Sequence, residues 1–395
     1  MPARPRALGA LVALFTAGYL APYLLPTLVG RLSAGLGLSS AQAGLIGSVL
    51  LLGSSCAGFA LASSVERIGP RGAARLGLAC MALGYGTAAA SASLSPVVAG
   101  AVLGGFGSGT ATAVAASGIS GRPDPHRAAT LGLLTVSATA GGLYLTLPHL
   151  GTGHALPFAA IAAAALLVWP LTGWLPGGTA ALRRTPVGPL PSRRAGAVLA
   201  ASILCWSMAQ NALWGVSGRI GLTQAGLSEV ALGLVFAVAL GAGLAGVTAA
   251  GALGPRLGRA APIGVGTALI AGCVVLSAAA DDAGSFATGE ILWNALYPVV
   301  LSHLLGLAAT LDPRGRWAVL VGSASSLGVA CGPVTGSLLS EAVGYPGMGL
   351  ALGALLLVVA APMTGVARRG AFSAGPLGSG AGVRPLSEEV SPSGV

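Results

Sequence analysis

Apolar runs long enough to cross a bilayer recur along most of this chain of 395 residues. A transmembrane helix needs about 20 consecutive, mostly apolar residues, and the sequence offers twelve candidates. They lie at approximately 8–30, 41–64, 75–93, 96–119, 127–148, 155–175, 197–218, 228–252, 261–280, 285–308, 317–340 and 346–366. Charged residues make up only 8% of the chain, against about 25% in a soluble domain. The sequence therefore predicts an all-α integral membrane protein.

Small residues supply much of the apolar material, since the chain has 64 glycines and only 5% aromatic residues. The predicted span 96–119 carries Gly100, Gly104, Gly105 and Gly109, which form two GxxxG pairs. No strand precedes these glycines and no lysine follows them, so they do not resemble a nucleotide-binding loop. They indicate transmembrane helices that pack closely together.

Metal-binding and catalytic motifs are missing from the sequence. The five cysteines and four histidines are scattered, with no CxxC pair and no HExxH motif, so we expect no metal site and no cofactor. No predicted span pairs a nucleophile with a base, and we expect the protein not to be an enzyme. The net charge of +10 comes from short arginine clusters between apolar runs, which indicates membrane-surface loops rather than nucleic-acid binding.

The arginines also predict the topology. With both termini in the cytoplasm, twelve spans place 18 of the 20 arginines on the cytoplasmic side, and only Arg31 and Arg219 outside. Loops rich in arginine stay in the cytoplasm, so we expect a multi-pass protein of the cytoplasmic membrane. Arg4 and Arg6 before an apolar run also suit a signal peptide, but the length of that run favours an uncleaved first helix.

The two halves of the chain repeat each other at an offset of 189 residues. Leu38-Ser39 aligns with Leu227-Ser228, and Arg67-Ile68-Gly69 aligns with Arg256-Leu257-Gly258. We predict a six-helix bundle at 1–175, a central cytoplasmic loop at 176–196, a second six-helix bundle at 197–366 and a disordered cytoplasmic tail at 367–395. Two pseudo-symmetric bundles that enclose a polar pathway are a transporter architecture.

Two copies of one loop motif strengthen this interpretation. The segment 62–71 reads ASSVERIGPR, and the segment 251–259 reads GALGPRLGR. Both lie on the predicted inner side at the same place in each half, and Gly69 and Gly258 suit a tight reversal of the chain. This motif resembles the one found in the twelve-helix transporters of the major facilitator superfamily. The resemblance covers nearly the full length of the chain.

That resemblance implies inner-gate loops. Their residues are Glu66, Arg67, Gly69 and Arg71 in the first copy and Arg256, Gly258 and Arg259 in the second. The resemblance implies that the first copy braces the inner gate against the start of the eleventh helix, near Arg316 and Trp317. The alternative is a simple arginine-rich loop without a gating role. The second copy has Pro255 in place of the acid, and we expect it to be structural.

The resemblance also implies that helices 1, 4, 7 and 10 face a central cavity. Three of them carry the polar and aromatic residues that we predict to bind substrate: Tyr19, Tyr23, Gln210, Asn211, Trp214, Glu290, Asn294 and Tyr297. For Gln210 and Asn211 the alternative is hydrogen bonding between helices. Tyr19 and Tyr23 are four residues apart and share one helix face.

Glu290 is the only acidic residue well inside a predicted span. Asn294 and Tyr297 follow at i+4 and i+7, so the three share one helix face. An ionisable residue inside a membrane is expensive and indicates function. We predict that Glu290 carries a proton or balances the charge of a cationic substrate. The alternative is an acid near the outer mouth, because Asp281 and Asp282 lie close by.

The predicted function is secondary transport of a small organic, amphipathic solute by alternating access, with efflux by proton antiport preferred over uptake or facilitated diffusion. Proton-coupled drug antiporters of the superfamily often carry a Gly-Pro pair in helix 5 and an arginine in helix 4. Here helix 5 lacks Gly-Pro and helix 4 has Ala101 in place of the arginine. The direction of transport therefore stays open. The alternative from another class is a non-transporting receptor or scaffold. We expect a monomer whose partners are the solute, protons and the lipid bilayer.

Overall fold

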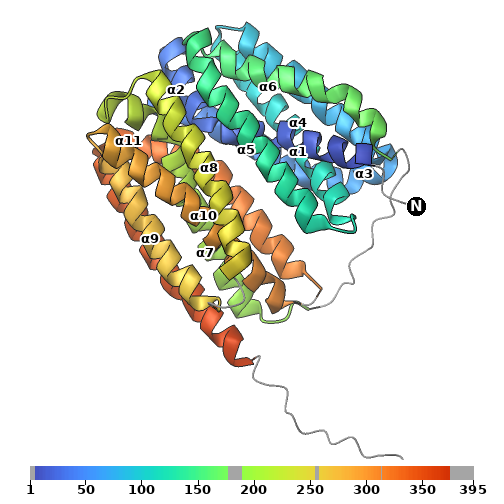
Figure 1. The fold of residues 1–395 in the computed structure, drawn as a ribbon, viewed down its shortest axis with the longest axis vertical. Helices are drawn as coiled ribbons and strands as arrows, with labels where there is room; N and C mark the ends of the chain where they lie inside the picture. The colour runs from blue at the N-terminus through green and yellow to red at the C-terminus, as the bar shows by residue number, and fades with distance from the viewer. Residues whose placement is uncertain (1–4, 177–188, 254–257, 313, 374–395) are drawn as a thin grey trace, which may run out of the picture.

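The computed structural model describes residues 5–176, 189–253, 258–312 and 314–373, and its side chains are described outside 5, 58–67, 251–253 and 370–373. The described part of the chain is helical and contains no strand. Figure 1 shows two helical bundles, one coloured blue to green and the other yellow-green to red. The all-α fold with two bundles predicted from the sequence is therefore confirmed.

The helices follow the predicted spans closely. In the first half they are α1 (Pro5–Tyr23), α2 (Leu25–Leu36), α3 (Ser40–Ala90), α4 (Leu94–Ser120), α5 (Pro125–Leu150), α6 (Ala155–Val168) and the 3-10 turn Trp169–Trp174. In the second half they are α7 (Arg193–Arg219), the π-helical turn Ile220–Gln224, α8 (Glu229–Leu253), α9 (Ala260–Ala279), α10 (Ala283–Leu311) and α11 (Arg316–Ser373).

Two of these helices contain a glycine with non-helical backbone. In α3 the break is at Gly69, with φ 73°, and in α11 it is at Gly344, with φ 71°. Pro70 follows the first glycine directly, and proline disfavours helical backbone in the residue before it while suiting the first turn of a new helix. Both breaks fall between two predicted spans.

Nine described helices are long and apolar enough to cross a membrane, and the bent pair α1–α2 makes ten. Splitting α3 and α11 at their glycines gives segments that match the twelve predicted spans. The number that cross a bilayer stays a prediction. Large apolar side chains such as Leu167 and Val358 are 75% and 68% exposed, as expected for a surface that lipid covers.

The first predicted span is not one straight helix. α1 and α2 meet at Leu24 with a bend of 48°. Pro22 lies within α1 and Pro26 in the first turn of α2, and neither can donate the backbone hydrogen bond that a continuous helix requires. This bend turns α2 toward the second bundle, where it packs on α7.

The internal repeat is visible in the backbone. Gly37 and Gly226 have φ of 62° and 68°, and Gly69 and Gly258 have φ of 73° and 62°. Both pairs are separated by the offset of 189 residues found in the sequence. The positive φ at Gly69 and Gly258 suits the tight reversals predicted there, because residues other than glycine adopt positive φ only at a cost.

The glycines of α4 pack as predicted. A side chain at Gly100 would meet the backbone of Gly84, and one at Gly104 would meet the ring of Tyr85. Gly105 and Gly109 lie against the backbone of α3 at Leu50 and Ser54. No side chain separates the two backbones at these positions, so α3 and α4 pack closely along this face.

The ends of two predicted segments differ from the structure. α7 begins at Arg193, inside the predicted loop 176–196, and α11 continues to Ser373, past the predicted boundary at 366. α7 therefore starts before its apolar run and α11 ends after its own, because arginine is a good helix former and its long side chain can stay at the membrane surface. The loop residues 177–188 and the tail 374–395 lie outside the described part of the chain.

Candidate functional site

An ion pair joins the two bundles. Arg31 Nη2 donates to Glu229 Oε2 at 2.8 Å and lies 3.3 Å from the carbonyl oxygen of Leu147. These contacts tie α2 and α5 of the first bundle to the start of α8 in the second. The Arg31 side chain is 8% exposed and the Glu229 side chain 33%, so the pair is partly shielded from water.

Two further hydrogen bonds join α3 to α11 near one end, and a longer one, from Ser55 Oγ to the carbonyl oxygen of Ser326 at 3.4 Å, joins them nearer the middle of both spans. The backbone N–H of Ala41 donates to Glu341 Oε1 at 2.8 Å, and the backbone N–H of Val334 donates to Ser48 Oγ at 3.0 Å. Gly44 lies against Ser337, which lets the two helices approach closely. Apart from Ser55 and Ser326, these residues lie toward the helix ends that the arginine distribution assigns to the outer side.

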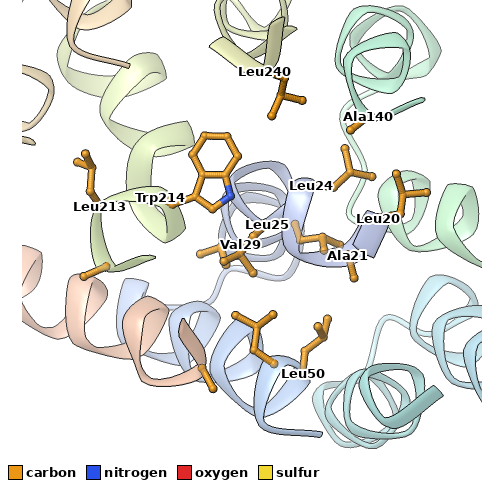
Figure 2. Close-up of a cluster of buried hydrophobic side chains, with 14 of the residues drawn as sticks. Leu20, Ala21, Leu24, Leu25, Val29, Leu50, Ala140, Leu213, Trp214 and Leu240 are labelled. Atoms are coloured by element: carbon orange, nitrogen blue, oxygen red, sulfur yellow. The ribbon is translucent and has the colours of Figure 1, made fainter. Parts of the chain in front are cut away.

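Trp214 of α7 fills the centre of this contact. Its indole N–H donates to the carbonyl oxygen of Pro22 at 3.1 Å. In a continuous helix this oxygen would accept from the backbone N–H of residue 26, but Pro26 has no N–H to donate. Figure 2 shows the indole ring beside Leu24, Leu25 and Val29 of the first bundle. The side chain is only 7% exposed. Trp214, which belongs to the predicted substrate site, therefore also packs between the two bundles.

A cavity of about 200 Å³ lies beside the ion pair. Its walls come from α2, α5, α7 and α8, and Arg31, Glu229, Tyr144 and Phe236 are among its lining residues. This volume is below the range of about 300–1,000 Å³ that is typical of ligand pockets. The cavity is therefore small for a ligand site, and it lies next to the Arg31–Glu229 ion pair.

Aromatic rings from α7 and α10 form a cluster. The rings of Trp206 and Tyr297 stack with centroids 5.2 Å apart, and Trp293 lies 5.6 Å from Trp214 and 6.5 Å from Tyr297. Trp206 and Trp293 were not among the predicted binding residues. The signal was present, because Trp206 and Trp214 lie four residues on either side of Gln210 and so share its helix face.

The amides predicted to bind substrate make hydrogen bonds within the second bundle. The indole N–H of Trp293 donates to Gln210 Oε1 at 2.8 Å, and Gln210 is fully buried. Asn211 donates to the carbonyl oxygen of Ser207, and Asn294 donates to that of Glu290, each at 2.9 Å. Gln210 thus joins α7 to α10, while Asn211 and Asn294 keep one acceptor oxygen each and partial exposure.

Tyr19 and Tyr23 lie one helical turn apart on α1. Both are partly exposed, and Tyr297 lies within electrostatic range of both. The hydroxyl group of Tyr144 donates to the carbonyl oxygen of Tyr23 at 2.6 Å, which links α5 to the bend after α1. The structure therefore brings Tyr19, Tyr23 and Tyr297 together, although they come from different bundles.

Glu290 points into the second bundle. Its carboxyl group is fully buried, and its Oε1 lies 2.8 Å from the hydroxyl oxygen of Ser217 on α7. Its Oε2 has no hydrogen-bond partner among the described residues. The carboxyl group is therefore not exposed to the outer mouth, and it does not share the partly exposed surroundings of Asn294 and Tyr297.

Comparison with models of protein families finds no match, and comparison with curated protein sequences finds none. Among solved structures, the chain is similar to the human organic anion transporter MFSD10, at 18% identity and a TM-score of 0.66, covering 92% of this chain and 100% of that one. It is also similar to a D-xylose–proton symporter, at 15% identity and a TM-score of 0.69, covering 90% and 96%. The POT family transporter PepTSo gives 12% identity, a TM-score of 0.76 and coverage of 94% and 99%.

The chain has the major facilitator fold. The similarity extends over at least 90% of its length in each of these structures. All three are transporters by their descriptions. At such low identity the similarity establishes the fold alone.

The two loops predicted to form the inner gate make hydrogen bonds within their own halves where they are described. Arg71 Nε and Nη2 both donate to the carbonyl oxygen of Leu175, at 3.1 and 2.7 Å. Arg259 Nη1 donates to Thr310 Oγ1 at 3.1 Å. The side chains of Glu66 and Arg67, and the whole of Arg256, lie outside the described residues. The bracing of the first loop against the eleventh helix stays a prediction.

Proposed function

We propose that the protein is a secondary transporter that moves a small organic solute across the cytoplasmic membrane by alternating access. The observation that carries this proposal is the placement of the contacts between the bundles. Arg31–Glu229, Trp214–Pro22 and Ala41–Glu341 all lie toward one end of the molecule. Bundles that are joined at one end can rock about a site between them, and we interpret the structure as a state closed on the side that the arginine distribution assigns to the outside.

The solute site lies between α1, α7 and α10. Tyr19 and Tyr23 lie within electrostatic range of Tyr297, and the aromatic cluster around Trp206 and Trp293 forms its wall on the second bundle. Flat aromatic faces bind apolar or cationic groups, while the free acceptor oxygens of the asparagines suit a polar end. These features support an amphipathic organic solute.

The hydrogen bonds of Ser217 support a proton on Glu290. The hydroxyl oxygen of Ser217 lies 2.8 Å from Glu290 Oε1 and 3.0 Å from the carbonyl oxygen of Leu213. A hydroxyl group has one proton, and a carbonyl can only accept, so both contacts are hydrogen bonds only when Glu290 donates. A charged carboxylate with an unpaired oxygen would also be expensive to bury.

Glu290 is therefore our candidate for proton coupling. If the bundles open and water reaches this carboxyl group, the group can release its proton. We propose export by proton antiport, with uptake or facilitated diffusion as the alternative within this class. A non-transporting receptor of the same fold is the alternative from another class, and it would bind the solute without moving it.

The test starts from a thermal-shift screen of amphipathic organic cations and anions on the purified protein. The best ligand is then followed in proteoliposomes that contain a pH-sensitive dye. We expect the ligand gradient to drive proton movement in the wild type and in Asp281→Asn, the control that removes an exposed acid. We expect Glu290→Gln to bind the ligand but to move no protons.

Two results would contradict the proposal. Solute movement that is unchanged by a pH gradient in the wild type would remove proton coupling. Binding without any movement of solute would favour the receptor. The predicted monomer, the location of both termini in the cytoplasm and the absence of a nucleic-acid partner belong to the same proposal, and protease access to a tag at each terminus tests the topology.

A further inference from the structure

A second, larger cavity lies in the second bundle, away from the proposed solute site. Its volume is about 1060 Å³. It lies between the starts of α7 and α9 and the last turns of α10 and α11, at the end that the arginine distribution assigns to the cytoplasm. Figure 1 shows the ends of α9 and α11 side by side below the second bundle. No function proposed above uses this cavity.

Arginines surround the cavity, and no acidic residue is among its described lining residues. Arg193 and Arg194 come from α7, Arg259 precedes α9, and Arg369 lies near the end of α11. In the described part of the chain, no carboxylate forms an ion pair with Arg193, Arg194 or Arg259. The like charges of Arg193, Arg194 and Arg259 repel each other, so an anion in the cavity would be stabilised by these three residues.

Two helices begin at this cavity without a capping side chain. Ser192 before α7 and Arg259 before α9 make no side-chain hydrogen bond to the first helical turn. The first N–H groups of a helix therefore lack partners there, and the partial positive charge of a helix start favours an anion. Ser192 is also the one described residue other than glycine with positive φ, at 50°.

The segment before α7 is held in place from α11. Arg316 Nη2 donates to the carbonyl oxygen of Pro189 at 3.2 Å, and the indole N–H of Trp317 donates to that of Pro191 at 2.6 Å. Trp317 also lies against Gly196, where a side chain would collide with its ring. The start of α7 is therefore fixed, and Arg193 and Arg194 are presented to the cavity from a rigid support.

Apolar residues complete the lining. Val198, Leu311, Pro362 and Val366 form a surface next to the arginines. A soluble anion such as phosphate would not use this surface, whereas a phospholipid has a glycerol group and acyl chains beside its phosphate. Basic pockets between helices on the cytoplasmic side are suited to anionic lipid headgroups.

We propose that this cavity binds the headgroup of an anionic phospholipid. The phosphate lies among Arg193, Arg194 and Arg259 at the starts of α7 and α9, and the apolar side chains contact the upper part of the acyl chains. The proposal is independent of the transported solute, since none of these residues belongs to the predicted solute site.

The test measures thermal unfolding of the full chain in a neutral detergent against increasing phosphatidylglycerol. A ligand that binds only the folded state raises the unfolding temperature in a saturable way. We expect this for phosphatidylglycerol and not for phosphatidylcholine or for soluble glycerol phosphate. For Arg194→Gln/Arg259→Gln we expect half-saturation at a lipid concentration about tenfold or more higher, because each arginine near an anionic lipid contributes about 1 kcal/mol.

The matched control is Arg6→Gln/Arg127→Gln, which removes two exposed arginines of the first bundle from the same predicted side. It should respond to phosphatidylglycerol as the wild type does. Arg194→Lys/Arg259→Lys keeps the charge and should retain most of the response, which separates binding from a folding defect. Equal stabilisation by glycerol phosphate, or an unchanged response in the double glutamine variant, would overturn the proposal.

Discussion

Breaking the Arg31–Glu229 ion pair is the most direct perturbation of the outer contact. Glu229→Gln keeps the size of the side chain and removes its charge. Arg31 would then retain the carbonyl oxygen of Leu147 as a partner, while its Nη1 already has no hydrogen-bond partner among the residues that the structure describes. In a state open to the outside, water would hydrate Arg31, so the substitution destabilises the closed state more than the open one.

The structure sets the size of the effect. Removing one partner of a fully buried pair costs about 3–5 kcal/mol, and an exposed pair is worth about 0–1 kcal/mol. With exposed fractions of 8% and 33%, the pair lies between these limits, and the retained hydrogen bond of the glutamine lowers the cost further. We expect about 1–2 kcal/mol, which shifts the ratio of closed to open molecules by about 5–30-fold.

Electron–electron distance measurements on spin labels can detect this shift. Thr152→Cys and Thr223→Cys place labels on exposed residues at the outer ends of the two bundles, in a background with the five native cysteines replaced. We expect Glu229→Gln to increase the population with a long distance between the labels. Asp281→Asn removes an exposed outer acid and should leave the distances unchanged. A Glu229→Gln distribution equal to that of the wild type would refute the gating role of the ion pair.

Three further predictions concern backbone, packing and pH. Gly69→Val should abolish transport without preventing membrane insertion, because the left-handed backbone at φ 73° costs a β-branched residue about 1–2 kcal/mol or more; full activity would reduce this loop to a topological anchor. Gly109→Val should lower the unfolding temperature by several degrees, because the new side chain would collide with the backbone of α3; Gly142→Val, an exposed helical position with open space, is the control for both. The hydrogen bond from Arg316 lowers the pKa of Asp312, so this carboxylate stabilises the fold above its unfolded pKa of about 4, and the stability is lost as the pH falls through the lower, folded pKa. In melts between pH 6 and pH 3, Asp312→Asn should therefore show a shallower loss of stability than the wild type, and parallel curves would contradict this.

Hydropathy and small-residue patterns predicted the fold well. Runs of apolar residues predicted nearly every helix, and the offset of 189 residues reappears in the left-handed glycines of both halves. The GxxxG pairs of α4 lie where close packing with α3 requires them. These features could be predicted because each depends on residues close together in the sequence or on a repeated local pattern.

The sequence predicted the candidate site less completely. It identified Tyr19, Tyr23 and Tyr297 by residue type, and they lie near each other. It did not predict that Gln210 accepts a hydrogen bond from Trp293, or that Glu290 points toward Ser217. Helical spacing shows which residues share a face, but the rotation of each helix within its bundle depends on all its neighbours.

Sequence alone determined that this chain enters a membrane as two repeated sets of apolar helices, because that outcome depends on hydropathy summed over each span. Only the tertiary structure decided which residues join the two bundles at the end that the arginine distribution assigns to the outside. Arg31 and Glu229 are 198 residues apart, and nothing local to either predicts the other. Their contact depends on how the bend at Leu24 turns α2 toward the second bundle, and therefore on the packing of the whole molecule.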